Sequence, residues 1–370
     1  MLACPDLSRR LIAIAGSAAL LALPATAQAR EVREVAGVNA AAIQSTVNQF
    51  RADLGALNPN EVGSFDTGRR EINWDGVPDA SSNPFPGDFF NAPMPGRARG
   101  VVFVNPPSDQ FQVSLNPPAM PRFANINPTY ATAFGTFSPE KLFAPIGSRT
   151  TTVNFFVPGE DTPATVAGFG AVFTDVDEIG SASIEFLDTQ GEQLFSREIL
   201  PSAGNGRLSF LGVSFEPEEG RVAQVTITSG AAALGPSDVT QTPGNPDVVA
   251  LDDFIYGEPV ESVPPDLQLS GKKKQKLGNA VKVKASCGDE ACTASGEGKL
   301  KKVKKDKVKP ASADLGPGET ATLKLKLTKK TRKRAAKALD QGKKVQAKVT
   351  VVATDAADNL ETAKRTIRLK

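Results

Sequence analysis

Val281-Lys282-Val283-Lys284 and Leu323-Lys324-Leu325-Lys326-Leu327 decide the fold of the C-terminal part of this 370-residue chain. Apolar and basic residues alternate strictly in both stretches, which is the period of a β-strand with one buried and one solvated face. Val345–Ala353 continues the alternation, and a short basic helix is expected before it, over Thr328–Gln341. About seven short strands over residues 266–370 favour an immunoglobulin-like β-sandwich.

A second β-rich region is expected over residues 58–258. From about Gly100 onward its apolar and polar residues alternate with a period of two. The expected strands are short, rich in Val, Phe, Thr and Ile, and bounded by turn residues, which is typical of an antiparallel sandwich of jelly-roll type. The sequence therefore predicts an all-β protein with a jelly-roll-like sandwich followed by a smaller immunoglobulin-like one. The expected strands of the first sandwich are Val101–Val104, Phe111–Leu115, Thr150–Val157, Val166–Phe173, Ser183–Leu187, Leu194–Leu200, Leu208–Phe215, Val222–Thr228 and Val248–Tyr256.

A helical segment is expected ahead of this sandwich, over residues 30–57. Within it Val38–Leu54 has one apolar stripe at helical spacing, and Asn39 can cap the first turn. The stripe consists of Ile43, Val47, Phe50 and Leu54. The following stretch, Asn58–Arg99, is rich in Pro, Gly and Asn and is predicted to form long loops.

The charge of the chain divides at a predicted linker, residues 259–265, whose prolines favour a short, semi-rigid spacer. Residues 266–370 hold 28 Lys and Arg against 11 Asp and Glu, a formal charge of +17. Residues 30–265 carry −16. The near-neutral total of +2 thus hides an acidic module and a strongly basic one.

Residues 1–29 have the pattern of an export signal peptide. Arg9 and Arg10 precede the apolar run Leu11–Leu23, and Ala27-Gln28-Ala29 fits the small-residue rule for cleavage. The run is shorter than the roughly 20 residues that span a bilayer. An ordinary secretory leader and a twin-arginine signal are both open. The mature chain is expected to be extracellular, either secreted or loosely attached to the cell surface, without a membrane-spanning segment.

The few cysteines and the absence of histidine limit the metal sites and catalytic mechanisms that the chain can have. Cys287 and Cys292 are close in sequence, and in an exported protein such a pair is expected to form a disulfide. A zinc or redox site is the alternative, but the chain has no histidine and its third cysteine, Cys4, belongs to the leader. The lack of histidine removes Ser-His-Asp triads and histidine-based metal sites. Carboxylate-only enzymes are the enzymatic class that is left.

Thr67-Gly68-Arg69-Arg70-Glu71-Ile72-Asn73-Trp74-Asp75-Gly76-Val77-Pro78 resembles a segment in a family of secreted bacterial proteins with a Gly-Arg-Arg-Glu-Ile-Asn-Trp-Asp-Gly signature. Segments similar to Gly168–Asp177 and Asp252–Glu258 occur in the same family, so the resemblance covers most of residues 40–258. It implies export and a β-rich module, and it implies no particular reaction.

Residues 266–370 resemble the basic immunoglobulin-like domains that end many bacterial exported proteins. Ala353-Thr354-Asp355-Ala356-Ala357-Asp358-Asn359 is similar to their usual Thr-Asp-Ala-Ala-Gly-Asn turn, with Asp358 in place of the glycine.

Asp175, Asp177, Asp252 and Asp253 are candidate ligands of a structural calcium ion. Adjacent strand residues face opposite sides, so either Asp252 or Asp253 points inward or lies at the rim of the sandwich. A buried carboxylate needs an arginine, backbone donors or a cation. Calcium accepts several oxygen ligands with loose geometry. A partner arginine from the preceding signature and a turn-capping role are the alternatives.

Trp74, the single tryptophan, lies among Arg69, Arg70, Glu71 and Asp75, and these five residues form a candidate ligand-binding set. One interpretation is a platform on which a sugar ring stacks. The other is a core tryptophan beside a cluster of arginines and carboxylates, which the alternation favours because Ile72 and Trp74 share one strand face. Glu71 and Asp75 would lie about 13 Å apart on a strand, too far for a glycosidase carboxyl pair.

The lysine runs Lys272-Lys273-Lys274 and Lys299–Lys309 are candidate contacts for an anionic cell-envelope polymer, extracellular nucleic acid or acidic lipid headgroups. Residues 266–370 contain no Phe, Tyr or Trp, which argues against specific nucleic-acid binding. A solvated face that protects strand edges and an attraction to the acidic module are the alternatives.

The sequence therefore predicts a secreted or surface-associated binding protein without catalytic activity, glycan-binding or adhesive. A carboxylate-dependent enzyme acting on polysaccharide and a structural component of the extracellular matrix are the rival classes.

Overall fold

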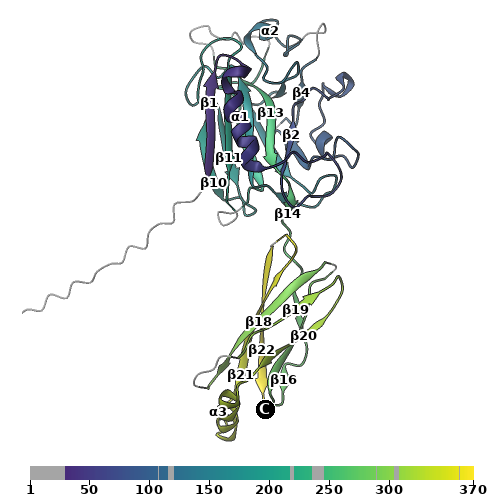
Figure 1. Cartoon of the computed structure of the whole chain (residues 1–370), viewed down its shortest axis with the longest axis vertical. Helices are drawn as coiled ribbons and strands as arrows, with labels where there is room; N and C mark the ends of the chain where they lie inside the picture. Colours follow the sequence, from purple (N-terminus) through teal and green to yellow (C-terminus); the bar gives the residue numbers. More distant parts are fainter. Residues whose placement is uncertain are drawn as a thin grey trace, which may run out of the picture.

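The computed structural model describes residues 30–106, 108–115, 121–216, 221–235, 246–288, 290–303, 308–357 and 359–370. They form two β-sandwich modules joined end to end, and the C-terminus lies at the far end of the second module (Figure 1). The all-β prediction is confirmed. The predicted leader, residues 1–29, lies outside the described residues. Among the described residues, no helix is long and apolar enough to cross a membrane.

The larger sheet of the first module has seven strands. Their order is β1-β11-β8-β13-β5-β4, and β2 also pairs with β13. All of these pairs are antiparallel. The bounds are β1 (Glu31–Gly37), β2 (Arg69–Ile72), β4 (Phe111–Val113), β5 (Phe143–Pro145), β8 (Gly168–Thr174), β11 (Leu208–Ser214) and β13 (Ala250–Gly257).

The smaller sheet packs against the larger one, and the inner side chains of both sheets meet in one hydrophobic core. Its strand order is β10-β9-β12-β6-β3. The core is rich in phenylalanine, as the composition of the predicted strands indicates. The bounds are β3 (Val101–Val104), β6 (Thr150–Phe155), β9 (Ser183–Leu187), β10 (Gln193–Glu198) and β12 (Gln224–Thr228).

Helix α1 (Ala40–Leu54) covers the outer face of the larger sheet. Its predicted stripe is buried against Val172, Phe210 and Ile255, and Asn39 Oδ1 accepts a hydrogen bond from the Ala42 amide. The helix prediction is confirmed. Because α1 and the inner core lie on opposite sides of the sheet, β8 and β13 are buried along their whole length. The shorter helical elements are η1 (Asp79–Ser81), η2 (Phe89–Asn91) and α2 (Tyr130–Ala133).

Two boundaries differ from the sequence prediction. Residues 31–37 belong to strand β1 rather than to a helical segment, because they pair with β11 from Glu31↔Ser214 to Gly37↔Leu208. In the predicted linker, Val260–Glu261 forms β14 and pairs with β7 (Ala164–Thr165). The first module therefore extends to about residue 262, and the free connection before the second module is shorter than predicted.

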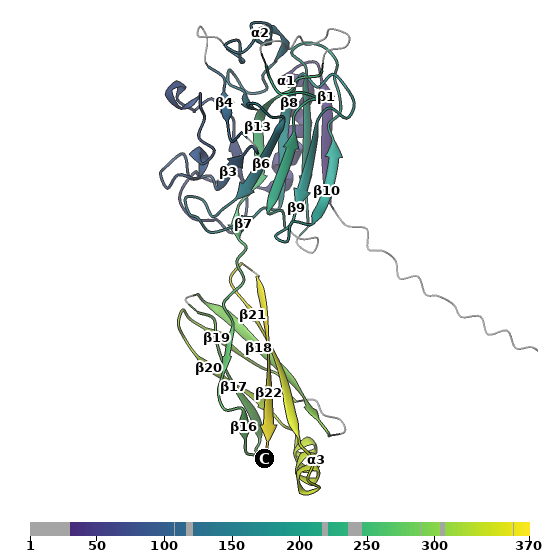
Figure 2. The same cartoon turned by 180° about the vertical axis from the view of Figure 1, so that it is seen from behind.

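The second module has its own core, built from aliphatic and small side chains. Its sheets have the orders β15-β17-β20 and β16-β22-β21-β18-β19 (Figure 2). Helix α3 (Lys329–Asp340), capped by Thr328, confirms the predicted basic helix. The strands are β15 (Gln268–Ser270), β16 (Lys274–Gln275), β17 (Ala280–Ser286), β18 (Cys292–Lys301), β19 (Ala311–Leu315), β20 (Ala321–Lys326), β21 (Gln346–Thr354) and β22 (Leu360–Leu369).

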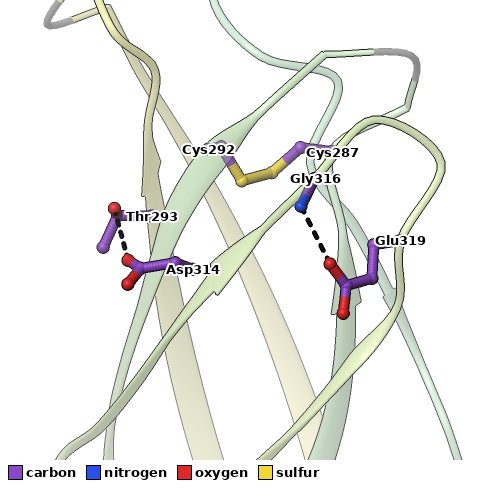
Figure 3. Close-up of a disulfide and its surroundings, with 6 residues drawn as sticks. All are labelled: Cys287, Cys292, Thr293, Asp314, Gly316 and Glu319. Atoms are coloured by element: carbon purple, nitrogen blue, oxygen red, sulfur yellow. Dashed lines mark hydrogen bonds between the residues drawn. A yellow bond between two sulfur atoms is a disulfide. The ribbon is translucent and has the colours of Figure 1, made fainter.

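The predicted disulfide between Cys287 and Cys292 is present, at the end of β17 and the start of β18 (Figure 3). Both cysteines are buried in the core of the second module. The bond closes the turn between the two sheets. Nearby, Thr293 Oγ1 donates to Asp314 Oδ1 at 2.9 Å, and the Gly316 amide donates to Glu319 Oε2 at 3.0 Å.

Candidate functional sites

The signature segment of the first module places Arg70 in a fully buried ion pair. Arg70 lies on β2, and its Nε and Nη2 donate to Glu258 Oε2 and Oε1 at 2.9 and 2.7 Å. Carbonyl oxygens of Glu61, Gly63 and Ala98 accept the remaining guanidinium protons. Glu258 also accepts from the Phe65 amide. Arg70 is therefore satisfied inside the protein and does not face a ligand.

Trp74 lies in the centre of the first core with 1 % of its surface exposed. Its ring stacks on Phe143 with centroids 4.2 Å apart, and its Nε1 donates to the Asp252 carbonyl at 2.8 Å. Its φ of 64° is rare for a bulky residue, which indicates that packing imposes this conformation. The structure agrees with the core interpretation, because no face of the ring is free for a sugar.

Two further signature side chains, Arg69 and Glu71, join a polar network at the edge of α1. Arg51 Nη2 lies 2.7 Å from Glu71 Oε2 and 3.4 Å from Asp253 Oδ2. Arg69 Nε lies 2.7 Å from Glu71 Oε1. Glu71 thus binds two arginines from α1 and β2. Asp75 lies apart from this network and accepts from the Lys141 amide at 3.0 Å.

Asp252 and Asp253 have opposite surroundings, as alternation on a strand requires. Asp252 is fully buried and accepts from the Phe137 amide at 2.6 Å and from Ser138 Oγ at 3.2 Å. Burial and then the neighbouring Asp253 charge raise the pKa of Asp252 well above its ordinary value. Burial raises the pKa of Asp253 to about 6, while hydrogen bonds and the Arg51 charge oppose this rise. The partner arginine is therefore Arg51, which the sequence interpretation did not name.

Asp175 belongs to a different cluster, at the end of β8. It is fully buried, and neither carboxylate oxygen has a hydrogen-bond partner among the described residues. Asp177 and Asp247 are its charged neighbours. Burial first, and then these two carboxylates, raise the pKa of Asp175 to about 8. Asp247 Oδ2 accepts from the amides of Asp177 and Glu178 at 3.1 and 3.2 Å.

The four carboxylates predicted to bind calcium do not form one site. Asp252 and Asp253 are bound by donors around Ser138 and Arg51, while Asp175 and Asp177 lie in the separate cluster with Asp247. Within the described ranges, no group of three His, Cys, Asp or Glu side chains is arranged to hold a metal ion. The predicted four-aspartate set therefore does not fit a single calcium ion.

A cavity of about 700 Å³ lies where the two modules meet. Its acidic lining residues come from both modules and from β14: Asp66, Glu160, Glu261, Glu290 and Asp355. Burial and neighbouring carboxylates raise the pKa values of Glu261 and Glu290. Asn359 Nδ2 donates to the Glu261 carbonyl at 3.1 Å, which ties the second module to β14.

The second module carries a basic groove of about 990 Å³ between β16, β17 and β20. We call it the lysine groove. It is lined by seven lysines and by no Asp, Glu or Arg. It adjoins a smaller cavity of about 390 Å³, which shares Lys274 and Lys370 with it. The seven lysines are Lys272, Lys274, Lys276, Lys282, Lys284, Lys324 and Lys370.

Gln275 positions the two sides of the lysine groove. Its Nε2 donates to the carbonyls of Lys272 and Lys282 at 3.1 and 2.6 Å, and its Oε1 accepts from the Lys282 amide at 3.0 Å. One side chain therefore links the β16 loop to the edge of β17. The run Lys272–Lys274 was a predicted contact, but part of the other predicted run, residues 304–307, lies outside the described residues.

No protein-family model matches the chain, and no curated protein matches it. Among solved structures, it is weakly similar to the glycoside hydrolase domain of Endo-D from Streptococcus pneumoniae R6, with 12% identity over 63% of this chain and 34% of that one, at a TM-score of 0.19. A β-1,2-glucanase from Parabacteroides distasonis matches with 10% identity over 77% of this chain and 37% of the other, at 0.20.

The N-terminal domain of the Streptococcus gordonii adhesin Sgo0707 matches with 12% identity over 62% of both chains, at a TM-score of 0.16. The chain thus spans little more than a third of the length of the two hydrolases. TM-scores this low support no inference about activity. The class that the fold defines is a β-sandwich protein of two modules, and the sites must be interpreted from their own chemistry.

Proposed function

We propose that this chain is a non-catalytic binding protein of the cell exterior, held at an anionic envelope polymer by its second module. The observation that carries the proposal is the lysine groove, where seven lysines gather without an acidic residue in the lining. Positive potential of this kind raises the local concentration of a polyanion and speeds its association. Export, expected from residues 1–29, would bring the groove to envelope polymers.

The carboxylates around Arg51 in the first module support a binding role rather than hydrolysis. A glycosidase needs two carboxyl groups that face a substrate from opposite sides of its scissile bond. Here Glu71 and Asp253 are both bound to Arg51, and Asp252 is fully buried. Each of these groups is engaged in holding α1, β2 and β13 together.

Retention on heparin tests the proposal with the mature chain, residues 30–370. We expect retention at low salt and elution as the salt concentration rises, because bound phosphates or sulfates release their counterions on contact with lysine. The acidic module should not prevent retention, since β16 and the C-terminal Lys370, which border the groove, belong to the end of the second module far from the first (Figure 1). Elution in the void volume at low salt would reject polyanion binding.

A further inference from the structure

The strand register fixes the positions of the lysines in the lysine groove relative to one another. Lys282 and Lys324 are direct cross-strand partners on β17 and β20, and both side chains are exposed. Like charges placed directly opposite each other destabilise a sheet. None of the groove lysines forms an ion pair with a described residue, so this repulsion is not relieved within the chain. The arrangement is what an external anion would stabilise.

The shape of the surface favours an extended ligand. The main groove and the smaller cavity beside it meet at Lys274 and Lys370, and the second cavity adds Lys343, Lys344 and Arg368. Lys282 and Lys284 are two residues apart on one strand, a separation of about 6.6 Å. A linear polymer that carries one charge in each repeat can therefore contact several lysines in succession.

The lining also limits the chemistry of the ligand. The main groove contains lysine and no arginine. Lysine is a common phosphate binder that acts as a point charge, and the planar, bidentate fork with which arginine holds carboxylates and phosphates is absent from the lining. The second module has no aromatic residue on which a sugar ring or a base could stack. The contacts available are therefore ionic contacts to the backbone of the ligand.

We infer that the lysine groove binds an extended phosphodiester polymer of an acyclic polyol, through its phosphates. This inference rests on the proposed function and names the ligand of the same site. Lys282, Lys284 and Lys324 lie on two strands of one sheet and contact successive phosphates, while Lys274 and Lys370 continue the contact into the adjoining cavity.

The test compares two triple variants of residues 30–370 with equal loss of charge. The groove variant is Lys282→Gln, Lys284→Gln and Lys324→Gln. The matched variant is Lys329→Gln, Lys330→Gln and Lys333→Gln. These three exposed lysines of α3 line neither the lysine groove nor the adjoining cavity, and they lie outside both predicted lysine runs. Circular dichroism melts confirm that both variants fold.

Binding to poly(glycerol phosphate) is measured against salt, with polygalacturonate of equal charge number as the comparison polymer. We expect the groove variant to bind roughly tenfold more weakly or worse, with a salt slope smaller by about 2–3, since three phosphate contacts are lost. The matched variant should bind like the wild type. The wild type should bind the phosphate polymer more tightly than the uronate.

Equal losses in the two variants would overturn the assignment of the groove and leave polyanion binding intact. Tighter binding of polygalacturonate than of poly(glycerol phosphate) would contradict the inference that the ligand is a phosphodiester polymer, and would indicate an acidic polysaccharide. Failure of the wild type to bind either polymer or heparin would instead reject the proposed function itself.

Discussion

The two modules use charge in opposite ways. The first module pairs many of its charges: all eight ion pairs between described residues lie within it, and the pair of Arg70 with Glu258 is fully buried. The second module has an aliphatic core without charged residues and keeps its lysines on the surface. Charge therefore holds elements together in the first module, whereas in the second it produces an electrostatic field toward solvent. Four changes test this difference, from the largest expected effect to the smallest.

Replacing Arg70 with Met should have the largest effect, because it leaves Glu258 buried without its partner. We expect a loss of about 3–5 kcal/mol in the free energy of unfolding. Arg69→Met is the control, since the pair of Arg69 with Glu71 is partly exposed and should cost about 1 kcal/mol or less. Urea unfolding followed by the fluorescence of Trp74, the single tryptophan, reports the first module alone. Similar losses in both variants would contradict the structural role of the buried pair.

Asp175→Asn should remove a pH dependence from the first module. The pKa of Asp175 is about 8 in the folded protein against about 3.8 when unfolded, so the unfolded chain loses this proton first. Stability contributed by the protonated group is complete below pH 3.8 and is lost as the pH rises toward 8. Between pH 5 and 7 the wild type should lose roughly 2–3 kcal/mol more than the variant.

Asparagine suits this position, because Asp175 has a φ of 69° and asparagine tolerates the left-handed region. The titration is repeated in calcium and in EDTA. Parallel curves of stability against pH for wild type and variant would contradict the raised pKa of Asp175. A wild-type melting temperature that falls in EDTA would show that a cation neutralises Asp175 instead.

Opening the disulfide should weaken the second module and leave the first unchanged. The closed loop from Cys287 to Cys292 is short, so the chain-entropy model gives about 2 kcal/mol. Calorimetry of the double variant Cys287→Ala and Cys292→Ala should show one shifted transition, while the Trp74 unfolding curve stays in place. A shift of both transitions would show that the modules unfold as one unit.

Lys324→Glu should stabilise the second module slightly, because it replaces a repulsive cross-strand contact with Lys282 by an attractive one. We expect a gain of about 0.2–1 kcal/mol, which decreases as salt is added. Chemical denaturation followed by circular dichroism measures it. A loss of stability at low salt would show that the lysines of the groove do not repel one another.

The fold was largely predictable because alternation is a local signal. Val101–Val104 and Ser183–Leu187 coincide with β3 and β9. Helix α1 begins after its predicted cap, Asn39, and α3 lies within the predicted range Thr328–Gln341. Strand β1 was missed because its residues are half-buried and do not alternate clearly. Strand β2, only four residues long, was not among the predicted strands because it lies within a Pro- and Gly-rich stretch, although the interpretation of Trp74 assumed strand alternation there.

The sites were less predictable because they depend on pairing between distant segments. Two segments of the sequence resemblance turn out to be neighbouring strands, with Arg70 opposite Tyr256, and this register brings Glu258 to Arg70. The neighbour Asp247 precedes β13 in a stretch without a sequence pattern. The outward lysines of β17 and β20 were predicted, but their convergence with the β16 loop depends on the Gln275 contacts.

The short pair between β14 and β7 has a mechanical consequence. If the second module is anchored and the first is pulled by flow, the tension passes along the chain through Val260–Glu261. The few hydrogen bonds of this pair lie directly in that path, ahead of either core. These hydrogen bonds would break before those inside either sandwich. The connection between the modules would then become longer by several residues, while both sandwiches remain folded.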